Sequence, residues 1–230
     1  MVTLKNGYDI DYNMINVDEE WNESERAELI MHTIHAYPAK FPAFIASKAF
    51  EYAQNEGVRI DKVADIFCGC GTVALESKIH NYDFWGCDIN PVATLIARTK
   101  SCDYNPEKLE EYYGSIKKTV ASIQLSEDEY ENANERLQYW FTKKSYISLL
   151  KLYQAIELTV DNGRYREAFE CVFSAILKAC SKWLTKSIKP QVDPNKKEIN
   201  VEQCFARQYK KLLKAVKELE CSTSSVEVKC

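Results

Sequence analysis

Gly69 and Gly71 stand where a ligand with an anionic group could approach the backbone. They lie in the segment Asp65-Ile66-Phe67-Cys68-Gly69-Cys70-Gly71-Thr72, between an apolar stretch and a helical one. Because glycine has no Cβ, such a turn admits a ligand closely, and the helix that Thr72 opens offers free N–H groups to an anion. Asp65 is a further candidate contact, with capping of the turn as its alternative role.

A second carboxylate, Asp88, follows the next apolar stretch roughly 20 residues after the glycine turn. At this place it could accept hydrogen bonds from two ribose hydroxyls. Its alternative role is to cap the helix that Pro91 opens. The glycines alone are a weak signal, since Ala74 stands where the dinucleotide pattern Gly-Xaa-Gly-Xaa-Xaa-Gly has its third glycine. The two acidic strand ends together favour a nucleoside site.

The elements that must position these residues alternate in type. The patterns predict a helix over 44–56, a strand over 58–67, a helix over 72–80, a strand over 83–88 and a helix from Pro91. Alternation of this kind predicts an α/β fold with a parallel sheet. Helical spacing then recurs over 106–124, 143–160, 165–183 and 201–220, with an exposed, mobile linker over 184–200 and a strand over 225–230.

We therefore expect four regions: an N-terminal arm (1–30), an α/β half-domain (31–105), a helical lobe (106–222) and a terminal strand (223–230). The chain has 230 residues, of which 46% are hydrophobic and 28% charged, so it can bury a core and is not a disordered tail. No apolar run reaches the roughly 18–20 residues of a membrane span, and the N-terminus lacks the pattern of a secretory signal.

Basic residues collect in the second half of the chain. Residues 1–140 carry 24 acidic and 13 basic side chains, whereas residues 141–220 carry 9 acidic and 16 basic ones, within a net charge of −4. A basic region can bind a phosphate backbone, and its alternative role is a set of solvated helix faces. The candidates for DNA phosphate contact are Lys178, Lys182, Lys186, Lys189, Lys196, Lys197 and Arg207.

The nine cysteines form no spaced framework, and the odd count favours a reduced, cytoplasmic protein without disulfides. Cys68 and Cys70 are expected to be small fillers beside the glycine turn rather than nucleophiles. His32 and His35 lack the acidic or cysteine partners of a zinc site, so we expect no metal.

Three segments together resemble a known family. HAYPAKFP (35–42) precedes a helix, DIFCGCGT (65–72) forms the glycine turn, and GCDINP (86–91) carries the second carboxylate. They are similar to the motifs HxYPAKFP, DPFCGSGT and GxDINP of Rossmann-like, S-adenosylmethionine-dependent DNA amino-methyltransferases. The likeness covers residues 32–101 and departs from the pattern at Ile66 and Cys70. It implies a class I methyltransferase sheet and S-adenosyl-L-methionine as cofactor.

The resemblance also implies roles for single residues. Lys40, Phe41 and Pro42 would line the methionine end of the cofactor, and Asp88, followed by Ile89, would hold its ribose. The residues that would cradle the cofactor are Asp65, Phe67, Gly69, Gly71 and Thr72. The implied reaction is methylation of an exocyclic amine in double-stranded DNA, cytosine N4 or adenine N6, in a restriction-modification or defence setting.

The catalytic motif of that family, Asp/Asn/Ser-Pro-Pro-Tyr/Phe, is absent, because no two of the six prolines are adjacent. No catalytic residue is therefore assigned. The resemblance implies seven strands, of which the chain supplies three, so we expect an incomplete sheet and a split enzyme. In it, a second subunit brings the remaining strands and the catalytic motif. The alternatives are a degenerate regulatory subunit, a nucleic-acid-binding module without catalysis, and a methyltransferase acting on RNA or a small molecule.

Overall fold

The computed structural model describes residues 28–230 except 39, 188 and 220–223. The expected N-terminal arm therefore lies outside the described residues apart from its last three positions. The described part begins with a short 3-10 helix, η3 (Ile30–Thr33), and continues into α1 (Ala43–Asn55).

A three-stranded parallel sheet follows, which confirms the predicted α/β class. Its strands are β1 (Lys62–Asp65), β2 (Asp83–Cys87) and β3 (Val226–Lys229), in the order β1-β2-β3. β2 is central, with Ala64 beside Trp85 and Trp85 beside Glu227 in register. The C-terminal strand thus joins the sheet beside β2, although more than 130 residues of chain separate them.

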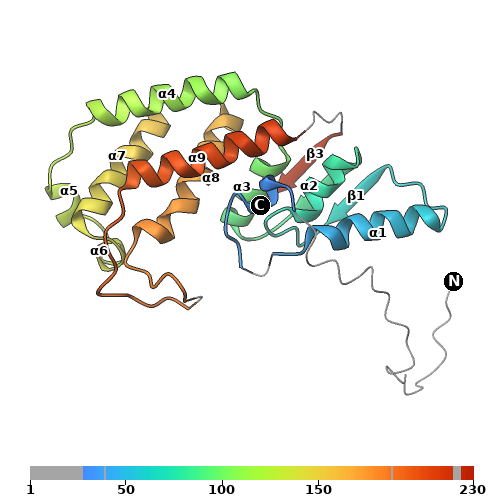
Figure 1. The fold of residues 1–230 in the computed structure, drawn as a ribbon, viewed down its shortest axis with the longest axis horizontal. Coiled ribbons are helices and arrows are strands. Elements are labelled where there is room, and N and C mark those ends of the chain that lie inside the picture. Colours follow the sequence, from blue (N-terminus) through green and yellow to red (C-terminus); the bar gives the residue numbers. More distant parts are fainter. Residues whose placement is uncertain (1–27, 39, 188, 220–223) are drawn as a thin grey trace, which may run out of the picture.

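Helices α2 (Thr72–Ile79) and α3 (Pro91–Ser101) cover one face of this sheet, and α1 packs against α2 (Figure 1). Phe84 of β2 is buried against Ala74 of α2, Ala97 of α3 and Val228 of β3. Burial of this apolar layer holds the helices on the strands.

The opposite face of the sheet is open in the described part of the chain. Along β1 and β2 the side chains alternate, so Ala64 and Trp85 lie on the face away from Phe84. Ala64 is exposed and Trp85 is half-buried. β1 is also an edge strand, since among the described residues only β2 pairs with it.

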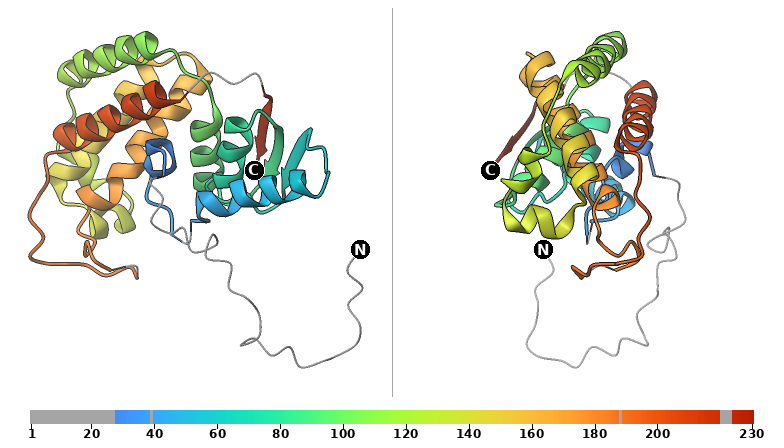
Figure 2. Two further views of the ribbon diagram at one scale, coloured as in Figure 1. Left: turned by 45° about the vertical axis from the view of Figure 1, so that its right-hand side comes forward. Right: turned by 90° about the vertical axis from the view of Figure 1, so that its left-hand side faces the viewer.

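The helices after residue 105 gather into a lobe, and α3 packs against α8 of this lobe (Figures 1 and 2). Its core joins apolar side chains such as Leu109, Leu152, Phe169 and Leu212. The helices are α4 (Pro106–Ser122), α5 (Asp128–Glu131), α6 (Glu135–Trp140), α7 (Lys143–Thr159), α8 (Gly163–Cys180) and α9 (Val201–Glu218). None of the helices in the described ranges is both long and apolar enough to span a membrane.

Three predicted segments differ in the structure. The helix expected over 165–183 ends at Cys180 in α8, because Trp183 joins an antiparallel bridge instead. The strand expected over 58–67 forms only over Lys62–Asp65, because the exposed residues on either side have no second strand to pair with. The linker expected over 184–200 contains part of a hairpin instead, with an antiparallel bridge between Trp183 and Val192. Backbone hydrogen bonds from Leu184 to Gln191 and from Asp193 to Lys182 complete it.

Candidate functional site

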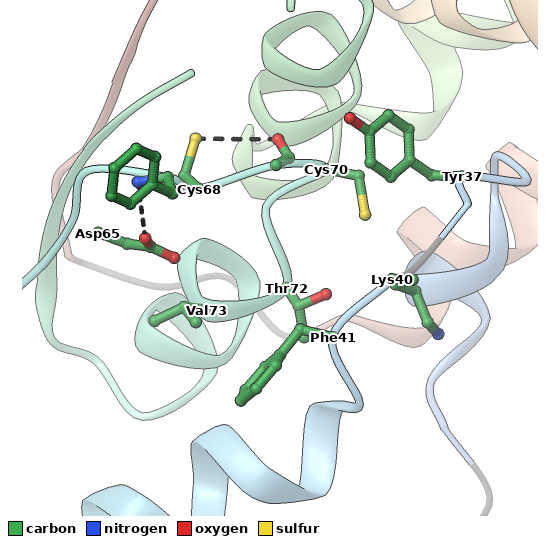
Figure 3. A pocket seen from close by; sticks show the side chains of 10 residues that line it. Tyr37, Lys40, Phe41, Asp65, Cys68, Cys70, Thr72 and Val73 are labelled. Atoms are coloured by element: carbon green, nitrogen blue, oxygen red, sulfur yellow. Dashed lines mark hydrogen bonds between the residues drawn. The ribbon is translucent and has the colours of Figure 1, made fainter. Parts of the chain in front are cut away.

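A pocket of ≈ 330 Å³ opens at the carboxyl end of β1 (Figure 3). This is the edge of a parallel sheet where α/β proteins bind ligands, and the volume is within the range of small-molecule sites. Its wall is made by the loop before α1, the end of β1 and the start of α2. The lining residues are Tyr37, Lys40, Phe41, Asp65, Phe67, Cys68, Gly69, Cys70, Thr72 and Val73.

The glycine turn has the backbone that its residue types predict. Gly69 has φ +50° and Gly71 φ +73°, both in the left-handed region that favours glycine. A Cβ on Gly69 would come near the Phe67 carbonyl alone, at 3.9 Å, whereas one on Gly71 would lie 2.6 Å from the Cα of Ala97. Gly69 thus leaves space beside the pocket, and Gly71 lets α2 and α3 pack closely.

Asp88 fixes this turn from the end of β2. Its Oδ2 accepts the N–H of Gly69 at 3.0 Å, and its Oδ1 accepts the N–H of Asn90 at 2.8 Å. Asp65 acts similarly within its own loop, accepting the N–H of Phe67 at 3.0 Å. Both carboxylates keep lone pairs for a ligand, since each oxygen can accept more than one hydrogen bond. The capping role weighed for Asp88 belongs to Asn90, whose side chain accepts the N–H of Val92.

The N-terminus of α2 carries unused hydrogen-bonding capacity toward the pocket. Gly71 occupies its N-cap position and no side chain caps the helix, whereas α3 begins with a capping asparagine. The hydroxyl of Thr72 is buried and has no hydrogen-bond partner within the described residues. A buried polar atom of this kind is costly to leave unpaired, so its position in the wall of the pocket points to a ligand that pairs with it.

The two cysteines of the turn face different electrostatic surroundings. Burial raises the pKa of the Cys68 thiol to about 12, and the nearby carboxylates of Asp65 and Asp88 act in the same direction. Cys70 has a lysine beside it instead, because the Nζ of Lys100 lies 3.5 Å from its sulfur. The pocket therefore has an acidic side at Cys68 and a basic side at Cys70.

Lys40 stands on the basic side, toward which the Thr72 hydroxyl and the Cys70 thiol point in Figure 3. Its ammonium forms an ion pair with Glu28. Burial opposes ionisation of Glu28, but the hydrogen bonds from Lys40 and from the Ala43 N–H outweigh it and lower the pKa of this carboxyl. The salt bridge fixes the loop before α1 at the mouth of the pocket.

The structure brings most of the predicted cofactor residues into one wall: Lys40, Phe41, Asp65, Phe67, Gly69 and Thr72. Three others adjoin that wall, because Pro42 and Gly71 are chain neighbours of lining residues and Asp88 accepts the N–H of Gly69. Ile89 directly follows Asp88 after the end of β2. Phe67 and Ile89 are 82% and 96% exposed. They leave an apolar surface at the sheet edge.

Sequence reasoning missed Tyr37 and Lys100. Tyr37 lines the pocket, and its hydroxyl accepts a hydrogen bond from Asn90 at 3.4 Å. Tyr37 sits inside the motif HAYPAKFP, which is the signal that could have found it. Lys100 follows Ala93, Ile96 and Ala97 at helical spacing, so it lies on the buried apolar face of α3. A lysine at this position is the signal that could have found it, although its partner cannot be read from the sequence.

The seven basic candidates for DNA contact fall into two groups. The ammonium groups of Lys178, Lys182 and Lys196 bind backbone carbonyls around the hairpin, at 2.8–3.0 Å. The other group is exposed and consists of Lys186, Lys189, Lys197 and Arg207. Lys178 is exposed as well, whereas Lys182 and Lys196 are half-buried, so among the described residues the charged groups without such carbonyl contacts are those of the second group.

Comparison with known proteins gives a family match. The model of the D12 class N6 adenine-specific DNA methyltransferase family matches residues 46–203. Type II methyltransferase M.MvaI of Kocuria varians is 25% identical over 177 residues, which cover 74% of this chain and 39% of that protein. Type II methyltransferase M.MjaII of Methanocaldococcus jannaschii is 27% identical over 165 residues, covering 71% of this chain and 30% of that protein. The chain thus aligns with less than half of either relative, and no solved structure matches it significantly.

Proposed function

This chain belongs to the D12 class N6 adenine-specific DNA methyltransferase family. From that premise we propose that it is the cofactor-binding subunit of a two-chain, S-adenosylmethionine-dependent methyltransferase acting on the N6 amine of adenine in DNA. The observation that carries the proposal is the pocket at the end of β1, where an uncapped helix start and the unpaired Thr72 hydroxyl meet the glycine turn. A restriction-modification or defence setting fits this activity.

The residues of the pocket fit a nucleoside joined to an amino acid. Asp88, held by two backbone N–H groups, offers its remaining lone pairs to ribose hydroxyls. The exposed side chains of Phe67 and Ile89 offer apolar surface to a purine ring. Lys40 and Thr72 stand at the other side, suited to the amino-acid end. When bound, the cofactor supplies an activated methyl group, and the task of this chain is to hold that group in line with its acceptor.

A partner polypeptide completes the enzyme in this proposal. Its support is that none of the residues described in the structure pairs with the outer edge of β1 or covers the face beside Ala64 and Trp85, whereas parallel sheets are normally covered on both faces. The 230 residues contain no Pro-Pro pair, so the motif that stacks on and hydrogen-bonds the flipped base must come from elsewhere. The complete sheet is then Rossmann-like, with an interface on the order of 2,000–5,000 Å².

The direct test is co-expression with the neighbouring gene product, followed by a methyl-transfer assay on DNA with each chain alone as control. We expect transfer to adenine N6 by the complex and none by either chain alone. Full activity of this chain by itself would overturn the two-chain proposal. A complex that binds the cofactor and DNA but transfers no methyl group would assign the regulatory role instead.

Contact with double-stranded DNA is tested through salt dependence. We expect the triple variant Lys186→Ala, Lys189→Ala, Lys197→Ala to flatten the slope of log K against log salt by about 0.9 for each phosphate that is no longer neutralised. The matched control neutralises three exposed lysines of α4, Lys108, Lys117 and Lys118, which lie across the lobe from the hairpin (Figure 1). Equal slopes in both variants would remove the hairpin region from the DNA interface.

A further inference from the structure

Lys100 is a buried charge without a carboxylate partner. Its side chain lies on α3 and is 0% exposed, and its Nζ contacts the Cys70 sulfur at 3.5 Å. Within the described part of the chain, no carboxylate forms an ion pair with it. A buried ammonium is strongly unfavourable unless a counter-charge or several hydrogen bonds compensate it.

Lys78 shows that this fold otherwise pairs a buried lysine. It is 3% exposed, and its Nζ lies 2.7 Å from an oxygen of Asp103. Lys100 has no such neighbour, and the ionisable groups that act on it are the thiols of Cys70 and Cys171 and the ammonium of Lys40. It in turn acts on His35, whose pKa burial and Lys100 both lower. Among the described residues, therefore, no carboxylate compensates the charge of Lys100.

The missing counter-charge has a place in the pocket. Cys70 lines the pocket and its sulfur contacts Lys100, which is buried and does not line the pocket itself, so one residue separates the ammonium from the pocket. The Thr72 hydroxyl, 3% exposed and unpaired, lines the same pocket and points to the same side as the Cys70 thiol (Figure 3). One anionic group bound on this side of the pocket would accept a hydrogen bond from the Thr72 hydroxyl and would also compensate the charge of the Lys100 ammonium.

We propose that Lys100 and Thr72 bind the carboxylate at the amino-acid end of the methyl donor, with Lys100 acting across the Cys70 thiol. This inference rests on the proposed function. The orientation of the methyl donor in this proposal follows from the two sides of the pocket. Its ribose, which carries hydroxyl groups, lies toward Asp65 and Asp88, and its carboxylate lies toward the lysines. Lys100 is then a positioning residue that makes the site selective for donors with a free carboxylate.

The selectivity is measured by calorimetric titration of the full chain, co-expressed with the neighbouring gene product, with two ligands. S-adenosylmethionine carries the carboxylate, and its decarboxylated analogue lacks it. In the Lys100→Met variant we expect the affinity for S-adenosylmethionine to fall about tenfold or more, while the affinity for the analogue stays within about twofold. The matched control, Lys78→Met, removes an equally buried lysine and should preserve the ratio of the two affinities.

The outcomes separate this inference from the proposed function. If the unmodified protein binds neither ligand, the cofactor role fails and the inference falls with it. If it binds both, but Lys100→Met weakens both equally or neither, Lys100 has only a structural role and the inference alone is overturned. Should Lys100→Met not fold, Thr72→Val decides, because it removes only the hydroxyl. A selective loss for the carboxylate-bearing ligand supports the proposal, and an unchanged ratio overturns it.

Discussion

The carboxylate of Asp88 has two roles: it holds the glycine turn, and in the proposed function it also binds the ribose. Replacing it by alanine removes the acceptor for the N–H groups of Gly69 and Asn90 as well as the ligand contact. We expect Asp88→Ala to weaken S-adenosylmethionine binding by about 1–3 kcal/mol in calorimetry. Asp61→Ala, at the other end of β1 and paired with Arg59 on the surface, is the control. Unchanged affinity in Asp88→Ala would contradict the site assignment.

Gly71 is required by packing rather than by ligand approach. Its φ of +73° disfavours any Cβ, and that Cβ would meet the backbone of Ala97 at 2.6 Å. We expect Gly71→Ala to lower the free energy of unfolding in urea by about 2 kcal/mol or more. Gly114→Ala, inside α4 with open space around it, should raise it by about 0.5–1 kcal/mol. If both substitutions changed the free energy of unfolding equally, Gly71 would have no special role in packing.

The sequence predicted that Gly69 and Asp88 lie together at the ends of neighbouring strands, and the hydrogen bond of 3.0 Å between them confirms this placement. Their roles toward a cofactor stay predictions. The contact of Lys100 could not be predicted, because its partner Cys70 lies 30 residues away and the contact exists only through the packing of α3 against the turn.

At the scale of elements, a buried hydrogen-bond network connects η3, α1 and α2. His32 Nε2 and Glu76 Oε1 are 2.6 Å apart, and the Ser47 hydroxyl donates to Glu76 Oε2 at 2.5 Å. His32 and Glu76 are 1% and 6% exposed. Burial raises the pKa of Glu76, but the hydrogen bonds from His32 and Ser47 outweigh it and lower that pKa. The ionised carboxylate of Glu76 thus holds α1 on α2 through this network.

The pH dependence of stability follows from that direction. Because the folded pKa of Glu76 lies below the usual 4.5, its stabilising contribution is complete above that pH and is lost as the pH falls through the folded value. We expect Glu76→Gln to lower the urea unfolding free energy at pH 7 by about 1–3 kcal/mol, with a smaller difference below pH 4.5. The exposed Glu51→Gln on α1 is the control. A difference that persists unchanged into acid would refute this account.

Elements were predictable to the extent that local patterns determine them. Proline and asparagine mark the start of α3 and α4, and both helices begin where the sequence indicates. β1 is shorter than predicted because pairing partners, not propensity alone, define a strand. The hairpin around Trp183 was missed because carbonyl contacts of Lys178 and Lys196, brought together by the tertiary fold, hold it.

At the scale of the whole molecule, one layer of helices covers the sheet, and none of the described residues covers its other face or pairs with the outer edge of β1 (Figure 2). The family resemblance implies an incomplete Rossmann-like sheet, and the described residues form a three-stranded parallel sheet in the order β1-β2-β3. How the C-terminal strand returns to β2 could not be read from local patterns, because the pairing spans the entire helical lobe. Because the pocket opens at the end of this edge strand, a segment that covered the edge would lie next to the residues that line the pocket.

The exposed apolar residue Ile66, directly after β1, is suited to test this surface. It is 61% exposed, so Ile66→Glu should leave this chain folded while placing a charge where an apolar partner strand would pack. We expect the affinity for the partner polypeptide to fall about tenfold or more, measured by titration of the purified chains. The control is Leu158→Glu, which also replaces an exposed apolar side chain by a carboxylate, but on α7 in the helical lobe. Leu158 is 73% exposed, and its substitution should leave the affinity for the partner polypeptide unchanged. If Ile66→Glu associates as tightly as Leu158→Glu, the edge of β1 is not the interface and the partner must bind elsewhere.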